Sequence, residues 1–308
     1  MEISILLAEQ ILAMFLTMAV GFGVVRAGLF KTEDSRIISN MVVYICNPCV
    51  VVHSFQIELT DDKIKGLMIA IGLSVVVHMV LIIGSEILSF IFHFNSIEKA
   101  SIIYTNAGYL VIPLVGAVLG EEWVFYTTAF ILVQTVLMWT HGVKLIGQEK
   151  ELNIRKILCN PNVIAMIIGI ALFALEIRLP TVVDSCVSGF GDMISPASMM
   201  VIGMVIGDVD LKWVFRQKRP YLICLLRLIV FPLIAVVAFA GLERSGIHTD
   251  AEYILMIVLI ATSAPAAAMI TQLAQIYGKD SRYASVINVM SVIFCIITMP
   301  VMVLSYEM

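Results

Sequence analysis

Long apolar stretches separated by short polar connections run along the whole chain. A helix needs about 20 apolar residues to cross a hydrocarbon core of about 30 Å. Segments of this length predict ten membrane-spanning helices, at 5–27, 36–57, 65–92, 98–119, 122–145, 160–178, 181–207, 219–242, 252–277 and 281–305. The longest connection runs from Gly147 to Asn160. The pattern therefore predicts an all-α polytopic membrane protein.

The composition leaves little of the chain to fold in water. Charged residues make up 14% of the sequence and apolar residues 60%, whereas a soluble domain has about 25% charged residues. The N-terminus, Met1-Glu2-Ile3-Ser4, lacks the basic segment of a cleaved signal peptide, so we expect the first helix to be retained. No polar segment is long enough for a soluble domain, so any second domain must also lie in the membrane.

Lysines and arginines are unequally divided between the two sides of the predicted bundle. The loops after the odd-numbered helices contain 14 of the 19, and the loops after the even-numbered helices contain four. The last one, Arg227, lies within a predicted helix. Because loops rich in Lys and Arg stay in the cytoplasm, this asymmetry predicts a multi-pass protein of the cell membrane with both termini on the extracytoplasmic side.

Two halves of the chain carry similar features at a constant spacing. Pro48 and Pro196 are 148 residues apart, and so are Gly21 and Gly169. Each half would hold five helices, an odd number, so the second half would be inserted upside down relative to the first. Inverted repeats are typical of secondary transporters, although two prolines can also pair by chance. The predicted division is a first repeat at 1–146, a cytoplasmic linker at 147–158 and a second repeat at 159–308.

Prolines interrupt the fourth and ninth predicted helices near their centres. A proline inside a helix removes one backbone donor and clashes with the carbonyl one turn back. In a bilayer such breaks persist only where protein or a wet cavity covers them, and paired breaks point to a transporter's substrate site. The free N–H groups of a half-helix N-terminus suit a carboxylate. The candidate binding residues are Asn106, Ala107, Gly108 and Pro113 in the fourth helix and Ser263, Pro265 and Ala266 in the ninth.

Polar residues on other helices extend this candidate site. Asn47 precedes Pro48 in the second helix, and that bend either lines the opposite wall of the cavity or merely kinks the helix. Gln134 and Asn288 lie at comparable depths in the fifth and tenth helices and complete the predicted set. The alternative at both breaks is a simple packing kink, which accounts less well for the polar residues beside the prolines.

Two charged residues lie within predicted spans, where charges are costly and usually face a cavity or a partner. Asp192, near the centre of the seventh helix, is a candidate for proton or cation coupling, because a desolvated carboxyl can exchange a proton near neutral pH. Its alternative role is a structural hydrogen bond to a neighbouring helix. Arg227, in the eighth helix, either neutralises an anionic substrate or forms a structural pair with Glu86.

Motifs of several other function classes are absent from the sequence. There is no Walker-type phosphate loop, no His-Glu-x-x-His or Gly-x-Ser-x-Gly pattern and no Thr-Val-Gly-Tyr-Gly filter. The six cysteines are scattered, and Cys46-Asn47-Pro48-Cys49 lies within a predicted span, which favours packing thiols over a redox or metal site. The sequence therefore predicts no enzyme activity, no cofactor, no metal and no nucleic-acid partner.

The sequence around the breaks resembles the auxin efflux carrier family, which includes plant auxin carriers and bacterial malate and malonate carriers. The most specific matches are Asn106-Ala107-Gly108-Tyr109 and Tyr277-Gly278-Lys279-Asp280, and the likeness extends over essentially the whole chain. This resemblance implies a sodium/proton-antiporter-like fold with 5+5 inverted repeats. It also implies that the broken fourth and ninth helices cross at Pro113 and Pro265.

The same resemblance implies two groups of helices with different tasks. The first, second, sixth and seventh would form a scaffold and a homodimer face, and the third to fifth and eighth to tenth a transport domain that moves like an elevator. Our leading hypothesis is therefore a secondary transporter of a small organic anion in the lipid bilayer. The alternatives are a sodium- or proton-coupled exchanger in which Asp192 titrates, and a membrane receptor without net transport.

Overall fold

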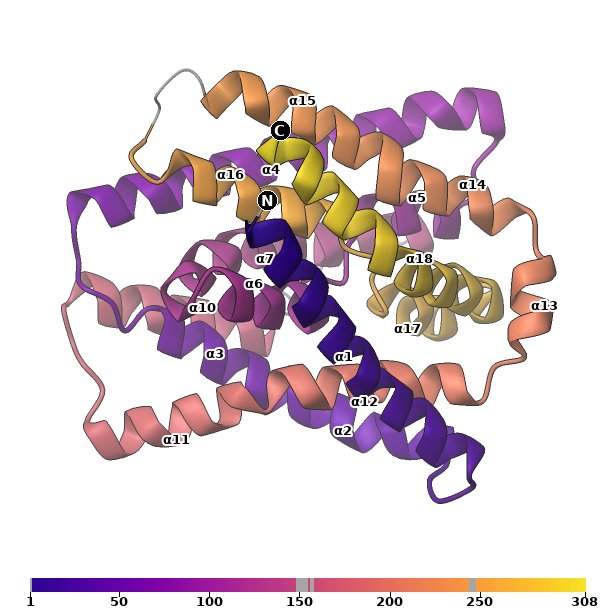
Figure 1. The fold of residues 1–308 in the computed structure, drawn as a ribbon, viewed down its shortest axis with the longest axis horizontal. Helices are drawn as coiled ribbons and strands as arrows, with labels where there is room; N and C mark the ends of the chain where they lie inside the picture. The colour runs from indigo at the N-terminus through magenta and orange to yellow at the C-terminus, as the bar shows by residue number, and fades with distance from the viewer. Residues whose placement is uncertain (1, 148–154, 156–157, 244–247) are drawn as a thin grey trace.

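A computed structural model describes residues 2–147, 155, 158–243 and 248–308, and the regular structure of these residues is helical (Figure 1). The first half contains α1 (Glu2–Arg26), α2 (Ser35–Met41), α3 (Asn47–Ser54), α4 (Asp61–Phe92), α5 (Ser96–Ile103), α6 (Ile112–Val118), α7 (Val124–Leu137) and α8 (Val143–Gly147). The second half contains α10 (Pro161–Ala174), α11 (Thr181–Asp192), α12 (Ile194–Gly207), α13 (Leu211–Arg216), α14 (Arg219–Leu225), α15 (Phe231–Glu243), α16 (Ala251–Ser263), α17 (Met269–Ile276) and α18 (Ser281–Glu307). Short turns of π-helix, η2 (Val42–Cys46), η3 (Ala107–Val111), η5 (Met138–Gly142) and η6 (Leu226–Val230), and of 3-10 helix, η1 (Thr32–Asp34) and η4 (Glu121–Trp123), join several of them.

Within the described residues, six helical segments are long and apolar enough to cross a membrane. They are Thr32–Ser54, Asp61–Phe92, Glu121–Gly147, Thr181–Gly207, Arg219–Glu243 and Ser281–Glu307. Four shorter apolar helices, Leu12–Arg26, Ala107–Val118, Pro161–Ala174 and Ala251–Ser263, fall within the first, fourth, sixth and ninth predicted helices. The all-helical class with several apolar spans is confirmed, whereas ten crossings and an inverted repeat stay predictions.

α1 packs closely against α12, and the two helices cross in Figure 1. Glycines allow this approach: a Cβ on Gly21 would collide with the Met200 carbonyl oxygen, and one on Gly203 with the Met18 carbonyl oxygen. In membranes, small residues are what let two helix backbones come this near. Gly169 of α10, the predicted counterpart of Gly21, similarly leaves room for the ring of Phe55, which directly follows α3.

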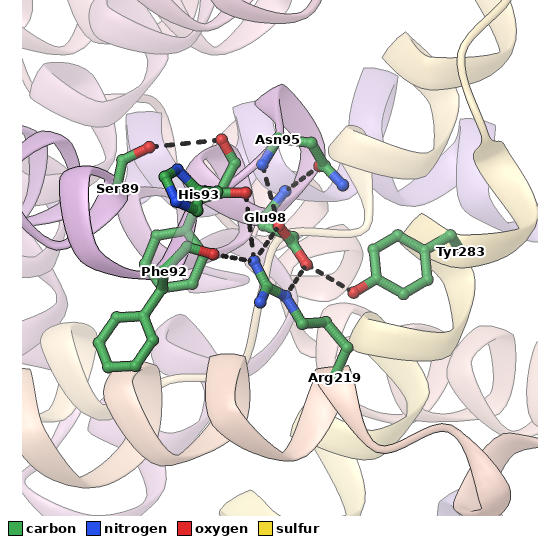
Figure 2. A network of polar contacts seen from close by, with 8 residues as sticks. Ser89, Phe92, His93, Asn95, Glu98, Arg219 and Tyr283 are labelled. Atoms are coloured by element: carbon green, nitrogen blue, oxygen red, sulfur yellow. Dashed lines mark hydrogen bonds and ion pairs between the residues drawn. The ribbon is translucent and has the colours of Figure 1, made fainter.

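One buried carboxylate joins the ends of α4, α5, α14 and α18 (Figure 2). Glu98 is only 2% exposed and accepts hydrogen bonds from Arg219 Nε, at 2.8 Å, and from the Tyr283 hydroxyl, at 2.8 Å. The backbone N–H of Asn95 donates to the same carboxylate, and this hydrogen bond caps the N-terminus of α5. Arg219 Nη2 donates to the Phe92 carbonyl at 2.6 Å. A buried charge is tolerable only when it is paired and hydrogen-bonded, and this network satisfies that condition.

Candidate functional site

Two interrupted helices meet at the centre of the candidate site. α5 ends at Ile103 and α16 at Ser263, and each is followed by a short extended segment. Thr105 and Ala266 in these segments form an antiparallel bridge. The backbone N–H of Asn106 donates to the Pro265 carbonyl at 2.8 Å, and that of Ala267 donates to the Tyr104 carbonyl at 3.0 Å. The backbone groups released by the two interruptions thus satisfy one another.

The prolines contribute differently to the two interruptions. Pro265 lies in the extended segment itself and cannot donate a helical hydrogen bond. Pro113 lies in the first turn of α6, seven residues after Asn106. The π-turn η3 runs directly into α6, so Pro113 lies inside the continuous helical segment Ala107–Val118. The prediction that the first break lies at Pro113 is therefore wrong, and the chain leaves the helix at Tyr104–Asn106 instead.

Side chains of α7 and α18 hold the bridge in place. The side-chain amide of Gln134 accepts from the Thr105 N–H and donates to the Thr105 carbonyl, both at 2.9 Å. On the other segment, Asn288 Nδ2 donates to the Ala266 carbonyl at 2.6 Å, and Ser291 Oγ accepts from the Ala266 N–H at 3.1 Å. Gln134 and Asn288, predicted as ligand-binding residues, therefore support the backbone. Ser291 could not be recognised from the sequence, because a serine in an apolar helix has no distinctive pattern.

Arg227 lies in the π-turn η6 with its side chain completely buried. Its Nη1 donates to the Ile102 carbonyl at 3.0 Å and its Nε to the Ala264 carbonyl at 3.2 Å. These carbonyls belong to the C-terminal ends of α5 and α16, where helical acceptors have no partner of their own. The predicted pair with Glu86 is wrong, because Glu86 bonds to Lys99 at 2.7 Å.

Several buried polar atoms beside the bridge have no hydrogen-bond partner within the described residues: Asn106 Nδ2, Asn47 Oδ1, Ser263 Oγ, Thr105 Oγ1 and Arg227 Nη2. Buried polar groups are normally hydrogen-bonded, so each exception needs an explanation such as a ligand or water. Asn47 faces the start of η3, since a Cβ on Gly108 would lie 3.2 Å from Asn47 Nδ2. The structure thus brings Asn47, Asn106 and Gly108 together, as the predicted site requires.

An apolar cavity opens at the bridge between α1, α12 and α18. Asn106 and Pro265 are among its lining residues, and Asn106 is the only one of these residues with a side-chain amide. The other lining residues are Met14, Phe15, Met18, Leu110, Met199, Ile202, Val292, Cys295, Ile296 and Met299. The volume of this cavity is only about 20 Å³, far below the roughly 300–1,000 Å³ of a typical small-molecule site, so it must widen before a ligand can enter.

Asp192 is the last residue of α11, within the apolar segment Thr181–Gly207, and it is exposed. That helix packs on α3 and η2, away from the two interrupted helices. No contact among the described residues joins Asp192 to the bridge. An ion-coupling role for Asp192 remains an untested prediction, as does the homodimer face expected on these helices. Within the same described residues, no group of three or more His, Cys, Asp or Glu could hold a metal ion.

A family model for membrane transport proteins, the family of the auxin efflux carriers, matches residues 6–154 and 150–303. The chain belongs to this family. The resemblance noted at the two breaks is thereby confirmed, and the protein is a membrane transporter with several apolar helices. A comparison with curated proteins finds no match.

Proposed function

We propose that this transporter moves a small organic anion and binds it beside the Thr105–Ala266 bridge. The observation that carries the proposal is the Asn106 amide nitrogen, which is buried without a partner in a residue that lines the cavity. A buried donor left without a partner costs about 1–3 kcal/mol. A carboxylate oxygen in the cavity would accept from it and remove that cost. The N-termini of the two half-helices that start beyond the bridge add further N–H donors and partial positive charge.

We propose an elevator-type movement for the transport step. α1 and α12 form one wall of the cavity and α18 the other, so the site lies between the proposed scaffold and the proposed transport domain. At η3, a hydrogen bond joins the proposed transport domain to the proposed scaffold: the Tyr109 hydroxyl bonds to Ser39 Oγ at 2.9 Å. This bond and the Gly108–Asn47 contact would have to break when the transport domain moves. An apolar boundary favours such sliding, because apolar side chains can move past one another without an exchange of hydrogen bonds.

Counterflow of labelled mono- and dicarboxylates in proteoliposomes tests this proposal. We expect wild-type protein to exchange at least one carboxylate, and Asn106→Ala to lose most of that exchange while remaining folded. Asn40→Ala is the matched control, because Asn40 lies exposed on α2. Wild-type exchange rates in Asn106→Ala would refute the proposed site. Saturable binding without counterflow would instead identify a receptor.

A further inference from the structure

Arg227 is a buried cation without a carboxylate partner in the described part of the chain. The other buried side chain that carries a full charge is Glu98, and Arg219 neutralises it. The ring Nδ1 of buried His78 donates to the Ser74 carbonyl within its own helix. An isolated buried charge is very costly, so something else must balance the Arg227 guanidinium.

The ends of two helices provide that balance. Arg227 donates one hydrogen bond to the last turn of α5 and one to the end of α16. A helix C-terminus carries roughly half of a negative elementary charge. Two such ends therefore amount to about one negative charge, which matches the single positive charge of the guanidinium.

The N-termini on the other side of the bridge have no such partner. The half-helix Ala107–Val118 and helix α17 start there, and each start carries roughly half of a positive elementary charge. Neither has an acidic residue in its first turn. Asn106, a residue only 4% exposed whose amide nitrogen has no partner among the described residues, lies at the same place and is one of the residues that line the cavity. The crossing is thus left with about one uncompensated positive charge.

We infer that Arg227 sets the charge of the ligand: by neutralising both half-helix C-termini it leaves a site that accepts one negative charge, that of a monoanion. This inference rests on the proposed function and narrows its substrate class from organic anions to monocarboxylates. A dianion would bring a second charge into a cavity that has no cationic side chain in its lining. Arg227 acts here as a positioning residue, because it bonds to the backbone and does not line the cavity.

Ligand series of matched shape test the charge of the site in the wild-type protein. Monocarboxylates of two to eight carbons are compared with their primary amides and with the dicarboxylates of equal length, by thermal shift and by counterflow. We expect at least one monocarboxylate to bind at least tenfold more tightly than its amide and its dicarboxylate. A dicarboxylate that binds more tightly than the monocarboxylate overturns this inference but leaves the proposed function intact. If no carboxylate binds, the proposed function fails as well.

Substitutions at Arg227 test whether this residue causes the preference for a monocarboxylate over its amide. We expect Arg227→Gln to lower the affinity for the monocarboxylate about tenfold and to leave the affinity for its amide unchanged. Arg227→Lys, which keeps the charge, should retain most of the preference, and Arg36→Gln, at an exposed arginine on α2, should retain all of it. A purely structural role would weaken both ligands equally, and that result would overturn the inference. If Arg227→Gln does not fold, the Arg227→Lys variant and the ligand series in the wild-type protein still test the inference.

Discussion

At the scale of single residues, polar side chains beside the bridge differ in what they contact. Gln134 uses both ends of its amide on Thr105, whereas the amide nitrogen of Asn106 has no partner. Both residues are polar amides inside apolar segments, so their sequence context is alike. The difference between them is the position of the neighbouring chain, and it separates a supporting residue from a candidate ligand-binding residue.

The support that Gln134 gives to the bridge can be measured as stability. Gln134→Leu leaves the N–H and the carbonyl of Thr105 without side-chain partners, at about 1–3 kcal/mol for each buried group. We therefore expect a clearly lower thermal unfolding temperature in detergent. Gln272→Leu is the control, because Gln272 lies exposed on α17 and its substitution should change the unfolding temperature little. Equal unfolding temperatures for wild type and Gln134→Leu would contradict the supporting role.

At the scale of helices, the position of a glycine on α1 decides whether a larger residue would fit there. Gly21 faces the backbone of α12, and a Cβ there would collide with the Met200 carbonyl oxygen. Gly23, on the same helix, has nothing within 4 Å of the corresponding position. Of these two glycines on α1, the one that the predicted repeat singled out is therefore the one that limits how closely α12 can approach.

Alanine substitutions separate these two glycines. We expect Gly21→Ala to destabilise the protein by about 1–3 kcal/mol, because α1 and α12 must move apart or distort. Gly23→Ala should not lower stability, since alanine is the better helix former by about 1 kcal/mol. Thermal unfolding in the same detergent compares the two variants. A Gly21→Ala protein as stable as Gly23→Ala would show that the close approach of α1 and α12 is not needed.

At the scale of the whole molecule, the distribution of basic residues predicts the orientation in the membrane. In this orientation the Glu98–Arg219 network lies at the cytoplasmic ends of its helices, and the connection between α3 and α4 lies outside. The family match and the apolar spans show a multi-pass transporter. These findings do not give the orientation of the bundle in the membrane, because its internal contacts are the same in both orientations.

Cysteine labelling in intact cells tests the orientation. In a variant with all six native cysteines replaced, Lys65→Cys should react with a membrane-impermeant maleimide and Lys31→Cys should not. Both lysines are exposed, so the comparison depends on the side of the membrane and not on burial. Permeabilised cells should label both variants. Labelling of Lys31→Cys alone in intact cells would reverse the predicted orientation.

The sequence by itself determined the helical class, the approximate helix positions and the region of the candidate site. Long apolar runs can satisfy their backbone groups in a bilayer only as helices, and the polar and proline-rich stretches around Asn106 and Pro265 mark where helices are interrupted. These properties depend on residues close together in the chain.

Only the tertiary structure decided the exact break near Asn106, the contacts by which Gln134 supports the backbone and the carbonyl partners of Arg227. The partners that settle these points are distant in sequence: Gln134 is 29 residues from Thr105, and Arg227 is 125 residues from Ile102. A backbone group freed by an interrupted helix takes whichever donor or acceptor the folded chain places beside it. Local sequence cannot specify that neighbour, because it is chosen by the packing of helices from both halves.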